Sequence, residues 1–178
     1  MPSATARVFI ALWPDPAARA LLSEWRDGHA WPAAASPVRT GQLHVTLHFL
    51  GNIPRERLPE LAQGVAVPFA PFELGLGHSE LWHGGIAVLA PDVVPERLLA
   101  LHGALGEALE RLGLPLEQRA YRPHVTLARG AGPALEPIAG PPIRWQVEGY
   151  ALMESKVGDG AEYGVVQSYG AIPRLTAK

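Results

Sequence analysis

The sequence predicts an α+β fold, because segments typical of strands and of helices both occur but do not alternate regularly. Short apolar runs rich in β-branched and aromatic residues indicate strands, and segments with leucines at helical spacing indicate helices. With 178 residues, 48% of them hydrophobic and 18% charged, the chain can bury a substantial core. We therefore expect residues 1–178 to form one domain, or two intimately packed halves.

The start of the chain predicts a strand, a helix and a second strand. Residues 7–13 are almost continuously apolar, which is typical of a central strand. Pro16 suits the first position of a helix, and Gly28 suits its end. Residues 29–42 are expected to form a loop, and the second strand follows at 44–51.

The remainder predicts two more helices and several strands. A short helix is expected at 53–65, although Pro59 weakens it, and a longer one at 95–113, where five leucines recur at helical spacing. His102 lies on or near that stripe, where we expect it to pack. A Gly/Pro-rich connection covers 130–142. Further strands are expected at 72–77, 84–91, 124–130, 144–155 and 161–171.

The stretch "HVTLHFLG" at 44–51 carries the first chemical signal. Strict alternation places His44, Thr46 and His48 on one face of a strand, because successive side chains point to opposite sides of the sheet. The pattern returns 80 positions later as "HVTLARG", which begins at His124. A single row of this kind fits any half-exposed strand, whereas a duplicated row indicates a shared function.

Two His-x-Thr rows suit substitution at phosphorus. If two half-domains place the rows on facing strands across a cleft, His44 and His124 approach one phosphate from opposite sides. Near neutral pH, one imidazole can act as a base and the other as an acid. The hydroxyls of Thr46 and Thr126 can donate hydrogen bonds to the non-bridging oxygens, where negative charge accumulates. This chemistry needs no metal.

Two neighbouring residues are less well determined by the pattern. Strict alternation places Arg129 on the face opposite His124, unless a bulge re-aims the side chain. His48 shares a face with His44, so we expect it at the rim of the cleft, exposed to solvent or touching the substrate. The aromatic side chains of Trp13, Trp82 and Tyr121 can stack on a nucleobase or pack in the interior.

Other chemistries fit the sequence less well. His44 and His48 would lie about 13 Å apart along a strand, too far to share one ion, and neither motif contains a carboxylate. The chain has no cysteine, which excludes thiolate metal sites and cysteine nucleophiles. The motifs of serine hydrolases and of dinucleotide or P-loop sites are absent. We expect no metal and no cofactor.

Charge and hydropathy bear on partners and location. The chain has 15 Lys and Arg against 17 Asp and Glu, a formal net charge of −2, so any phosphate should be bound locally rather than by a globally basic surface. The apolar run at 7–13 is too short to span a bilayer and is a poor signal peptide. We expect a cytoplasmic monomer with no membrane association and no obligate protein partner.

The sequence resembles the two-histidine phosphoesterase superfamily, and within it the LigT-like RNA 2′,3′-cyclic phosphodiesterases, also called 2′-5′ RNA ligases. The resemblance covers nearly the whole chain, although Gln42 stands where many relatives have Asn. It is carried by the stretches "RVFIALWPDP", "LHVTLHFLGNIP", "RPHVTLARG" and "YALMESKVGDGAEYGVVQSY".

The resemblance implies a bilobal α+β fold, with two related lobes whose antiparallel sheets line a central cleft. It also implies metal-independent opening of a terminal RNA 2′,3′-cyclic phosphate to a 2′-phosphate. His124 would be the base and His44 the acid, with Thr46, Thr126 and Arg129 binding the phosphate.

The expected partners are RNA ends or small nucleotides that carry a 2′,3′-cyclic phosphate. Two other functions stay open. One is the reverse reaction, which joins RNA ends through a 2′-5′ bond, and the other is a non-catalytic module that binds RNA ends. Retention of both His-x-Thr rows weighs against a binding module, because binding alone does not require a matched acid and base.

Overall fold

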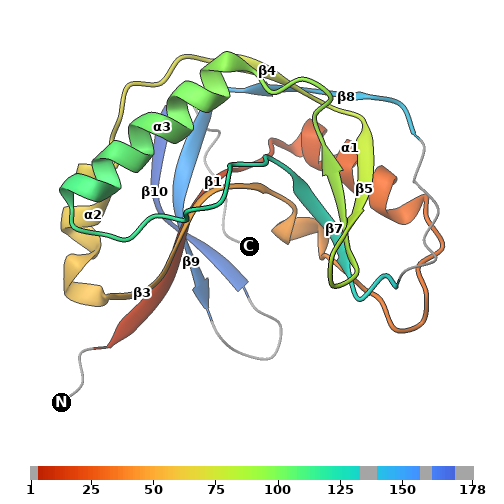
Figure 1. Ribbon diagram of the computed structural model, residues 1–178, viewed down its shortest axis with the longest axis horizontal. Coiled ribbons are helices and arrows are strands. Elements are labelled where there is room, and N and C mark those ends of the chain that lie inside the picture. Colours follow the sequence, from red (N-terminus) through yellow and green to blue (C-terminus); the bar gives the residue numbers. More distant parts are fainter. Residues whose placement is uncertain (1–3, 133–139, 157–161, 171–178) are drawn as a thin grey trace.

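The computed structural model describes residues 4–132, 140–156 and 162–170, and its fold is α+β, as predicted (Figure 1). The predicted connection at 130–142 lies mostly outside these ranges. The strands are β1 (Thr5–Leu12), β2 (Ser36–Pro37), β3 (Val45–Pro54), β4 (Phe72–Leu76), β5 (His78–Trp82), β6 (Ile86–Ala90), β7 (Val125–Arg129), β8 (Ile143–Val147), β9 (Gly149–Lys156) and β10 (Glu162–Gly170). The helices are α1 (Pro16–Asp27), α2 (Leu58–Gly64) and α3 (Glu96–Arg111), with short 3-10 turns η1 (Thr40–Gln42) and η2 (Arg55–Arg57).

Most strands form one large sheet, in the order β10-β9-β1-β3-β7-β6-β5, with β2 beside β7. Strands β4 and β8 form a separate two-stranded sheet. Every strand pairing among the described residues is antiparallel. The large sheet therefore combines strands from both ends of the chain.

The sheet consists of two halves that meet at β3 and β7. These two strands are paired only through Val45 and Val125, whereas β1 and β3 share a long ladder. Figure 1 shows the resulting arch, with α2 and α3 outside the half that contains β1, β3 and β9, and α1 beside the half that contains β7. The two His-x-Thr strands thus lie at the junction of the halves.

The sequence of strand β1 is continuously apolar because both faces of the strand are buried. Val8, Ile10 and Leu12 belong to the main core beneath the helices. Phe9, on the other face, belongs with Trp13 to a second cluster completed by β9. A strand buried on both sides loses the alternation of polar and apolar residues.

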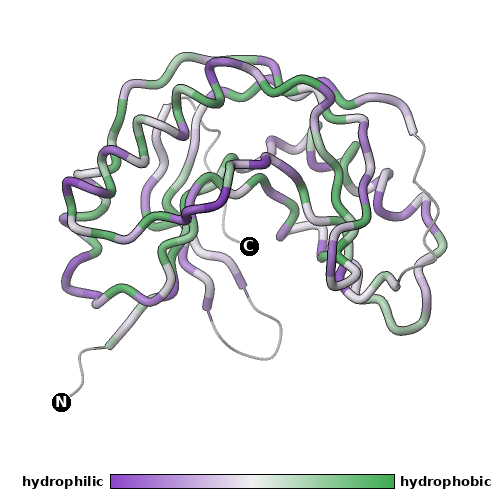
Figure 2. The backbone as a smooth tube through the Cα atoms, in the orientation of Figure 1, coloured by the Kyte–Doolittle hydropathy of each residue, from purple (hydrophilic) through white to green (hydrophobic). Residues whose placement is uncertain are grey.

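Helices α1 and α3 follow the predicted signals, whereas the helix expected at 53–65 begins only at Leu58, since residues 53–54 belong to β3 and 55–57 to η2. Asp15 caps α1, its Oδ1 accepting a hydrogen bond from the Ala18 amide at 2.7 Å, and the helix ends before Gly28. Helix α3 buries Leu98, Leu101, Leu105 and Leu109 against the sheet. In Figure 2 hydrophobic and hydrophilic colours alternate along α3, as expected of a helix with one buried face.

One strand prediction was wrong, and two short strands were missed, of which β2 lies in the segment 29–42 that was expected to be a loop. The strand expected at 144–155 is two strands, because β8 pairs with β4 in the small sheet whereas β9 pairs with β1 and β10 in the large one. The chain changes sheets at Glu148. Strand β5 was not predicted at all, since its sequence "HSELW" is largely polar and only partly buried.

Candidate active site

A bulge follows the threonine of the first motif. In the β1–β3 ladder, Ala11 pairs with Thr46 and Ile10 with His48, so Leu47 is an extra residue on β3. An extra residue reverses the alternation of the side chains beyond it. His48 therefore turns away from the face that carries His44.

The prediction for His48 was accordingly wrong. Its side chain is only 8% exposed, and its Nε2 lies 2.9 Å from the carbonyl oxygen of His102 on α3. The next residue, Phe49, takes the cleft face instead and is 54% exposed.

The second motif contains the same irregularity. In the β6–β7 ladder, Val88 pairs with Thr126 and Ala87 with Ala128, so Leu127 is the extra residue. Because of this bulge, the Arg129 side chain lies on the same face as His124 and lines the cleft, whereas strict alternation had placed it on the opposite face. Phe49 and Arg129 thus occupy equivalent positions, each five residues after its histidine.

The two motif strands are neighbours in one sheet, not facing strands on opposite walls as predicted. The antiparallel pair Val45–Val125 places His44 beside Thr126 and Thr46 beside His124. Residues related diagonally across such a pair lie about 7–8 Å apart. His44 and His124 are related in this way, so both imidazoles line the same cleft from neighbouring strands.

All five predicted site residues line one cleft of about 540 Å³. It opens on the face of the sheet that carries the Phe9–Trp13 cluster. The lining residues are Arg7, Phe9, Val38, Gln42, His44, Thr46, Phe49, His124, Thr126, Arg129, Ser155 and Tyr163.

His44 is held in one orientation by hydrogen bonds at both ring nitrogens. Its Nδ1 lies 2.6 Å from the backbone carbonyl of Gln42, which can only accept, so Nδ1 carries the proton in the neutral ring. Its Nε2 then accepts from the Thr46 hydroxyl at 3.0 Å. The lone pair of the neutral ring is therefore on Nε2, beside the Thr46 hydroxyl.

Aromatic rings surround His44. Its ring centroid lies 5.1 Å from Phe9, 5.9 Å from Trp13 and 5.5 Å from Tyr163. Burial lowers the pKa of His44 to about 4, and the positive charges of His124, Arg19 and Arg129 act in the same direction. His44 is consequently neutral near pH 7 in the ligand-free protein.

His124 is oriented in a similar way by a different set of residues. Its Nδ1 donates to the backbone carbonyl of Arg122 at 2.8 Å, and its ring lies 4.2 Å from that of Trp82. Glu80 accepts hydrogen bonds from Trp82 at 2.6 Å and from Arg122 at 2.7 Å, so one carboxylate fixes both neighbours. Burial lowers the pKa of His124 below its usual range.

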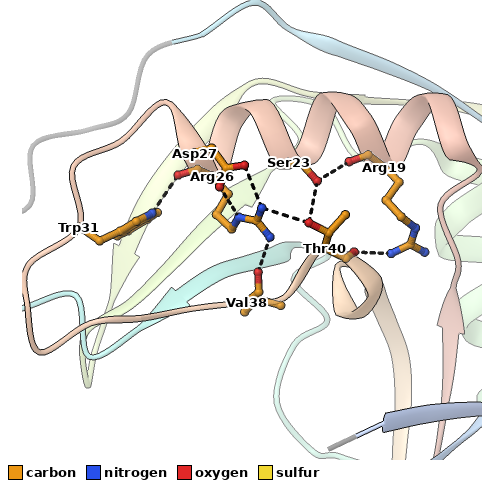
Figure 3. A network of polar contacts seen from close by, with 7 residues as sticks. All are labelled: Arg19, Ser23, Arg26, Asp27, Trp31, Val38 and Thr40. Carbon is orange, nitrogen blue, oxygen red and sulfur yellow. Dashed lines mark hydrogen bonds and ion pairs between the residues drawn. The ribbon is translucent and has the colours of Figure 1, made fainter. Parts of the chain in front are cut away.

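Helix α1 anchors the segment that leads into His44 (Figure 3). The Arg19 guanidinium donates to the carbonyls of Thr40 and Leu43 at 2.6 and 3.2 Å, and that of Arg26 donates to the Val38 carbonyl at 2.6 Å. Sequence reasoning did not find this network, because its acceptors are backbone atoms of a segment predicted only as a loop.

Two arginines, Arg7 and Arg129, line the cleft. Arg122 and Arg55 form ion pairs with Glu80 and Glu154, whereas no carboxylate among the described residues pairs with Arg7 or Arg129. Among the residues that the structure describes, the cleft therefore holds two arginines whose charge no carboxylate neutralises, which favours an anionic ligand.

The aromatic residues considered for base stacking serve mainly to pack. Trp13 lies against His44, Trp82 lies against His124, and the Tyr121 hydroxyl donates to the carbonyl of Thr46. None of the three lines the cleft, whereas Phe49 does. Phe49 was missed because strict alternation assigned it to the buried face.

Within the described ranges, no group of three or more His, Asp or Glu side chains is placed to hold a metal ion. None of the described helices is long and apolar enough to cross a membrane.

Two His-x-Thr rows on neighbouring strands meet in one cleft, as the resemblance to two-histidine phosphoesterases implies. Comparison with known proteins agrees with this class. The chain belongs to the 2′-5′ RNA ligase superfamily, whose sequence pattern it matches over residues 13–159.

Two relatives bear the name RNA 2′,3′-cyclic phosphodiesterase. The one from Escherichia coli (strain K12) is 32% identical over 83% of each chain, and the one from Thermus thermophilus is 32% identical over 92% of this chain and 89% of the relative. Among solved structures, Escherichia coli LigT complexed with 3′-AMP matches with a TM-score of 0.85 and 27% identity, covering 94% of this chain and 98% of LigT. A structure from Thermus thermophilus matches with a TM-score of 0.78 and 29% identity, covering 92% and 97% of the two chains.

Proposed function

We propose that this protein is an RNA 2′,3′-cyclic phosphodiesterase that hydrolyses a terminal cyclic phosphate to a 2′-phosphate by acid–base catalysis with two histidines. The observation that carries the proposal is the meeting of both imidazoles and both threonines in one cleft. The names of the two curated relatives, and the 3′-AMP bound to LigT, support the same substrate class.

Because the Nδ1 atoms of His44 and His124 both face backbone carbonyls, we infer that the Nε2 atoms carry out the chemistry. One neutral imidazole takes a proton from water, the water oxygen attacks phosphorus, and the bond from phosphorus to O3′ breaks. The other imidazole, protonated, gives its proton to O3′, so the phosphate stays on O2′. Following the resemblance, we assign the base to His124 and the acid to His44.

The acid must carry a proton that the ligand-free site disfavours. A phosphodiester anion bound between the two rings supplies the missing negative charge, and an opposite charge within about 4–6 Å favours the protonated imidazole. Substrate binding would thereby raise the pKa of His44 from about 4 and prepare it to act as an acid.

The threonines and Arg129 would bind the phosphate itself. The Thr46 and Thr126 hydroxyls line the cleft beside the imidazoles and can donate to the non-bridging oxygens. Arg129 also lines the cleft, and since no described carboxylate pairs with it, its guanidinium can bind the same oxygens, where negative charge grows in the transition state.

The nucleoside would lie against the ring of Phe49, which lines the cleft. Phe49 presents an exposed ring there, and the Arg7 guanidinium lies 5.0 Å from its centroid. Aromatic and guanidinium planes are the surfaces on which unpaired bases stack. This end of the cleft fits the terminal base of an RNA chain or a small nucleotide.

The alternatives are weaker for physical reasons. Ligation through a 2′-5′ bond would use the same acid and base in exchanged roles, but water is abundant in dilute solution, so hydrolysis should dominate. A pure binding module would not need two oriented imidazoles. That the protein is a cytoplasmic monomer stays a prediction.

The decisive test is incubation of the protein with an oligoribonucleotide that ends in a 2′,3′-cyclic phosphate, in the presence of EDTA. We expect turnover to survive chelation, and the product phosphorus to be identified by NMR as a 2′-phosphate. Activity that EDTA abolishes and a divalent ion restores would require metal activation of water instead.

A further inference from the structure

Three rings from three separate elements form a continuous stack behind the cleft. The rings of His48 on β3 and His102 on α3 are nearly parallel at 14°, with centroids 4.1 Å apart. The ring of Tyr121, in the segment before β7, lies on the other side of His102 at 3.9 Å and 13°. Burial lowers the pKa of His102 to about 4 and also lowers that of His48, so near neutral pH both imidazoles stack without like-charge repulsion.

The stack ends in a hydrogen bond to the first motif. The Tyr121 hydroxyl donates to the backbone carbonyl of Thr46 at 3.1 Å, and burial raises the pKa of this phenol, which keeps its proton available. Tyr121 is three residues before His124, whose Nδ1 is bound by the Arg122 carbonyl. The bond therefore links the backbones of the two motifs.

This hydrogen bond lies where few backbone hydrogen bonds join the two halves of the sheet. Strands β3 and β7 are paired only through Val45 and Val125 before the two halves separate. Thr46 is the first residue beyond that pair. If the Tyr121 hydrogen bond were absent, the single residue pair Val45–Val125 would have to fix the angle between the strands. The separation of Thr46 from His124 depends on that angle.

We propose that Tyr121 is a positioning residue that sets the spacing of the two His-x-Thr motifs through its hydrogen bond to Thr46, and that His102 and His48 hold its ring in place. Tyr121 does not line the cleft and acts only through the motif backbones. In-line substitution is sensitive to such spacing, because a shift of about 1 Å in a catalytic group can cost about 10²-fold in rate.

Tyr169 supplies a matched control. Its hydroxyl likewise donates to a backbone carbonyl, that of Ala62 at 2.6 Å on α2, and its ring also stacks on a neighbour, Tyr150, at 4.7 Å. It touches neither motif. Tyr121→Phe and Tyr169→Phe each remove one oxygen and one comparable hydrogen bond, so both should lower thermal stability, but only the first should affect the site.

The experiment measures single-turnover opening of a cyclic-phosphate end and amide hydrogen exchange in both variants. For Tyr121→Phe we expect the single-turnover rate to fall by about 10–10²-fold. The protein concentration that gives half-maximal rate should stay within about twofold, because the nucleoside contacts remain. Amide exchange at residues 44–48, 122 and 124–126 should accelerate by about 2–13-fold, which corresponds to the free energy of one lost hydrogen bond. Tyr169→Phe should change neither quantity at the motifs.

Substitutions of His102 test the role of the stack. His102→Ala removes the middle ring and should reproduce the loss seen in Tyr121→Phe. His102→Phe keeps a flat ring at the same place and should restore the rate. Equal losses in Tyr121→Phe and Tyr169→Phe, or unchanged rate and exchange in Tyr121→Phe, would overturn the proposal.

The rate measurement rests on the proposed function, whereas the exchange measurement does not. If the wild-type protein opened no cyclic phosphate, the proposed function would fail and exchange at the two motifs would decide the role of Tyr121 by itself.

Discussion

Neutral His44 should contribute strongly to stability above pH 6.5. Its pKa is about 4 in the folded protein against 6.5 for an ordinary histidine. Because the folded pKa is the lower one, the unfolded chain binds the proton more tightly, so the contribution is complete above pH 6.5 and is lost as pH falls toward 4. A shift of this size corresponds to about 3 kcal/mol in all, of which about 2 kcal/mol is lost between about pH 7.5 and pH 5.

Urea unfolding of the wild-type protein and of His44→Gln at these two pH values isolates this contribution. Glutamine does not titrate, whereas the other histidines remain in both proteins and cancel in the comparison. We expect the wild-type protein to lose about 2 kcal/mol more than His44→Gln on acidification. His83→Gln, which replaces an exposed histidine, controls for loss of a histidine in general. An equal pH dependence in wild-type and His44→Gln proteins would refute the reasoning.

Three further predictions concern the cleft. Thr126→Ala should weaken binding of a 2′-phosphate product by about 1.5–3 kcal/mol, the value of a hydrogen bond to a charged group; calorimetry showing unchanged affinity would exclude contact with the phosphate. Phe49→Ala should lower kcat/KM for a cyclic nucleotide by the equivalent of about 1–3 kcal/mol of base stacking. It should leave kcat/KM for ribose 2,3-cyclic phosphate, which has no base, unchanged. Leu99→Ala, at another exposed apolar position, should change kcat/KM for neither substrate. Because the pKa values of His44 and His124 are both lowered, the bell-shaped profile of kcat/KM should peak below about pH 6.5; a peak above pH 7.5 would contradict these environments.

The sequence was sufficient for the elements whose signals are local. The helix from Pro16 to Gly28 was predicted from its capping residues, and the leucines of α3 from their spacing. The duplicated His-x-Thr rows predicted a shared cleft without any knowledge of which strands are neighbours.

What the sequence could not provide is the register between strands. The bulges at Leu47 and Leu127 change which face each later residue occupies, and they are visible only in the pairing with β1 and β6. For this reason strict alternation misplaced His48, Phe49 and Arg129, and only the family resemblance pointed Arg129 toward the site.

Contacts between distant segments were equally hidden. The Tyr121 hydroxyl meets a carbonyl 75 positions away, and Arg19 binds the carbonyl of Thr40 across a loop. Every residue has a backbone carbonyl, so the sequence does not indicate which carbonyl will accept such a hydrogen bond. These contacts become visible only in the folded structure.

The most direct test of the two-histidine mechanism is single-turnover hydrolysis of a cyclic-phosphate end by His44→Ala and His124→Ala, measured beside equilibrium binding of a 2′-phosphate product analogue. Loss of one proton-transfer group should slow turnover by about 10²–10⁴-fold in each variant, while binding falls much less and folding is unchanged. Near-normal turnover in either folded variant would show that the histidine is not catalytic and would favour a protein that only binds RNA ends.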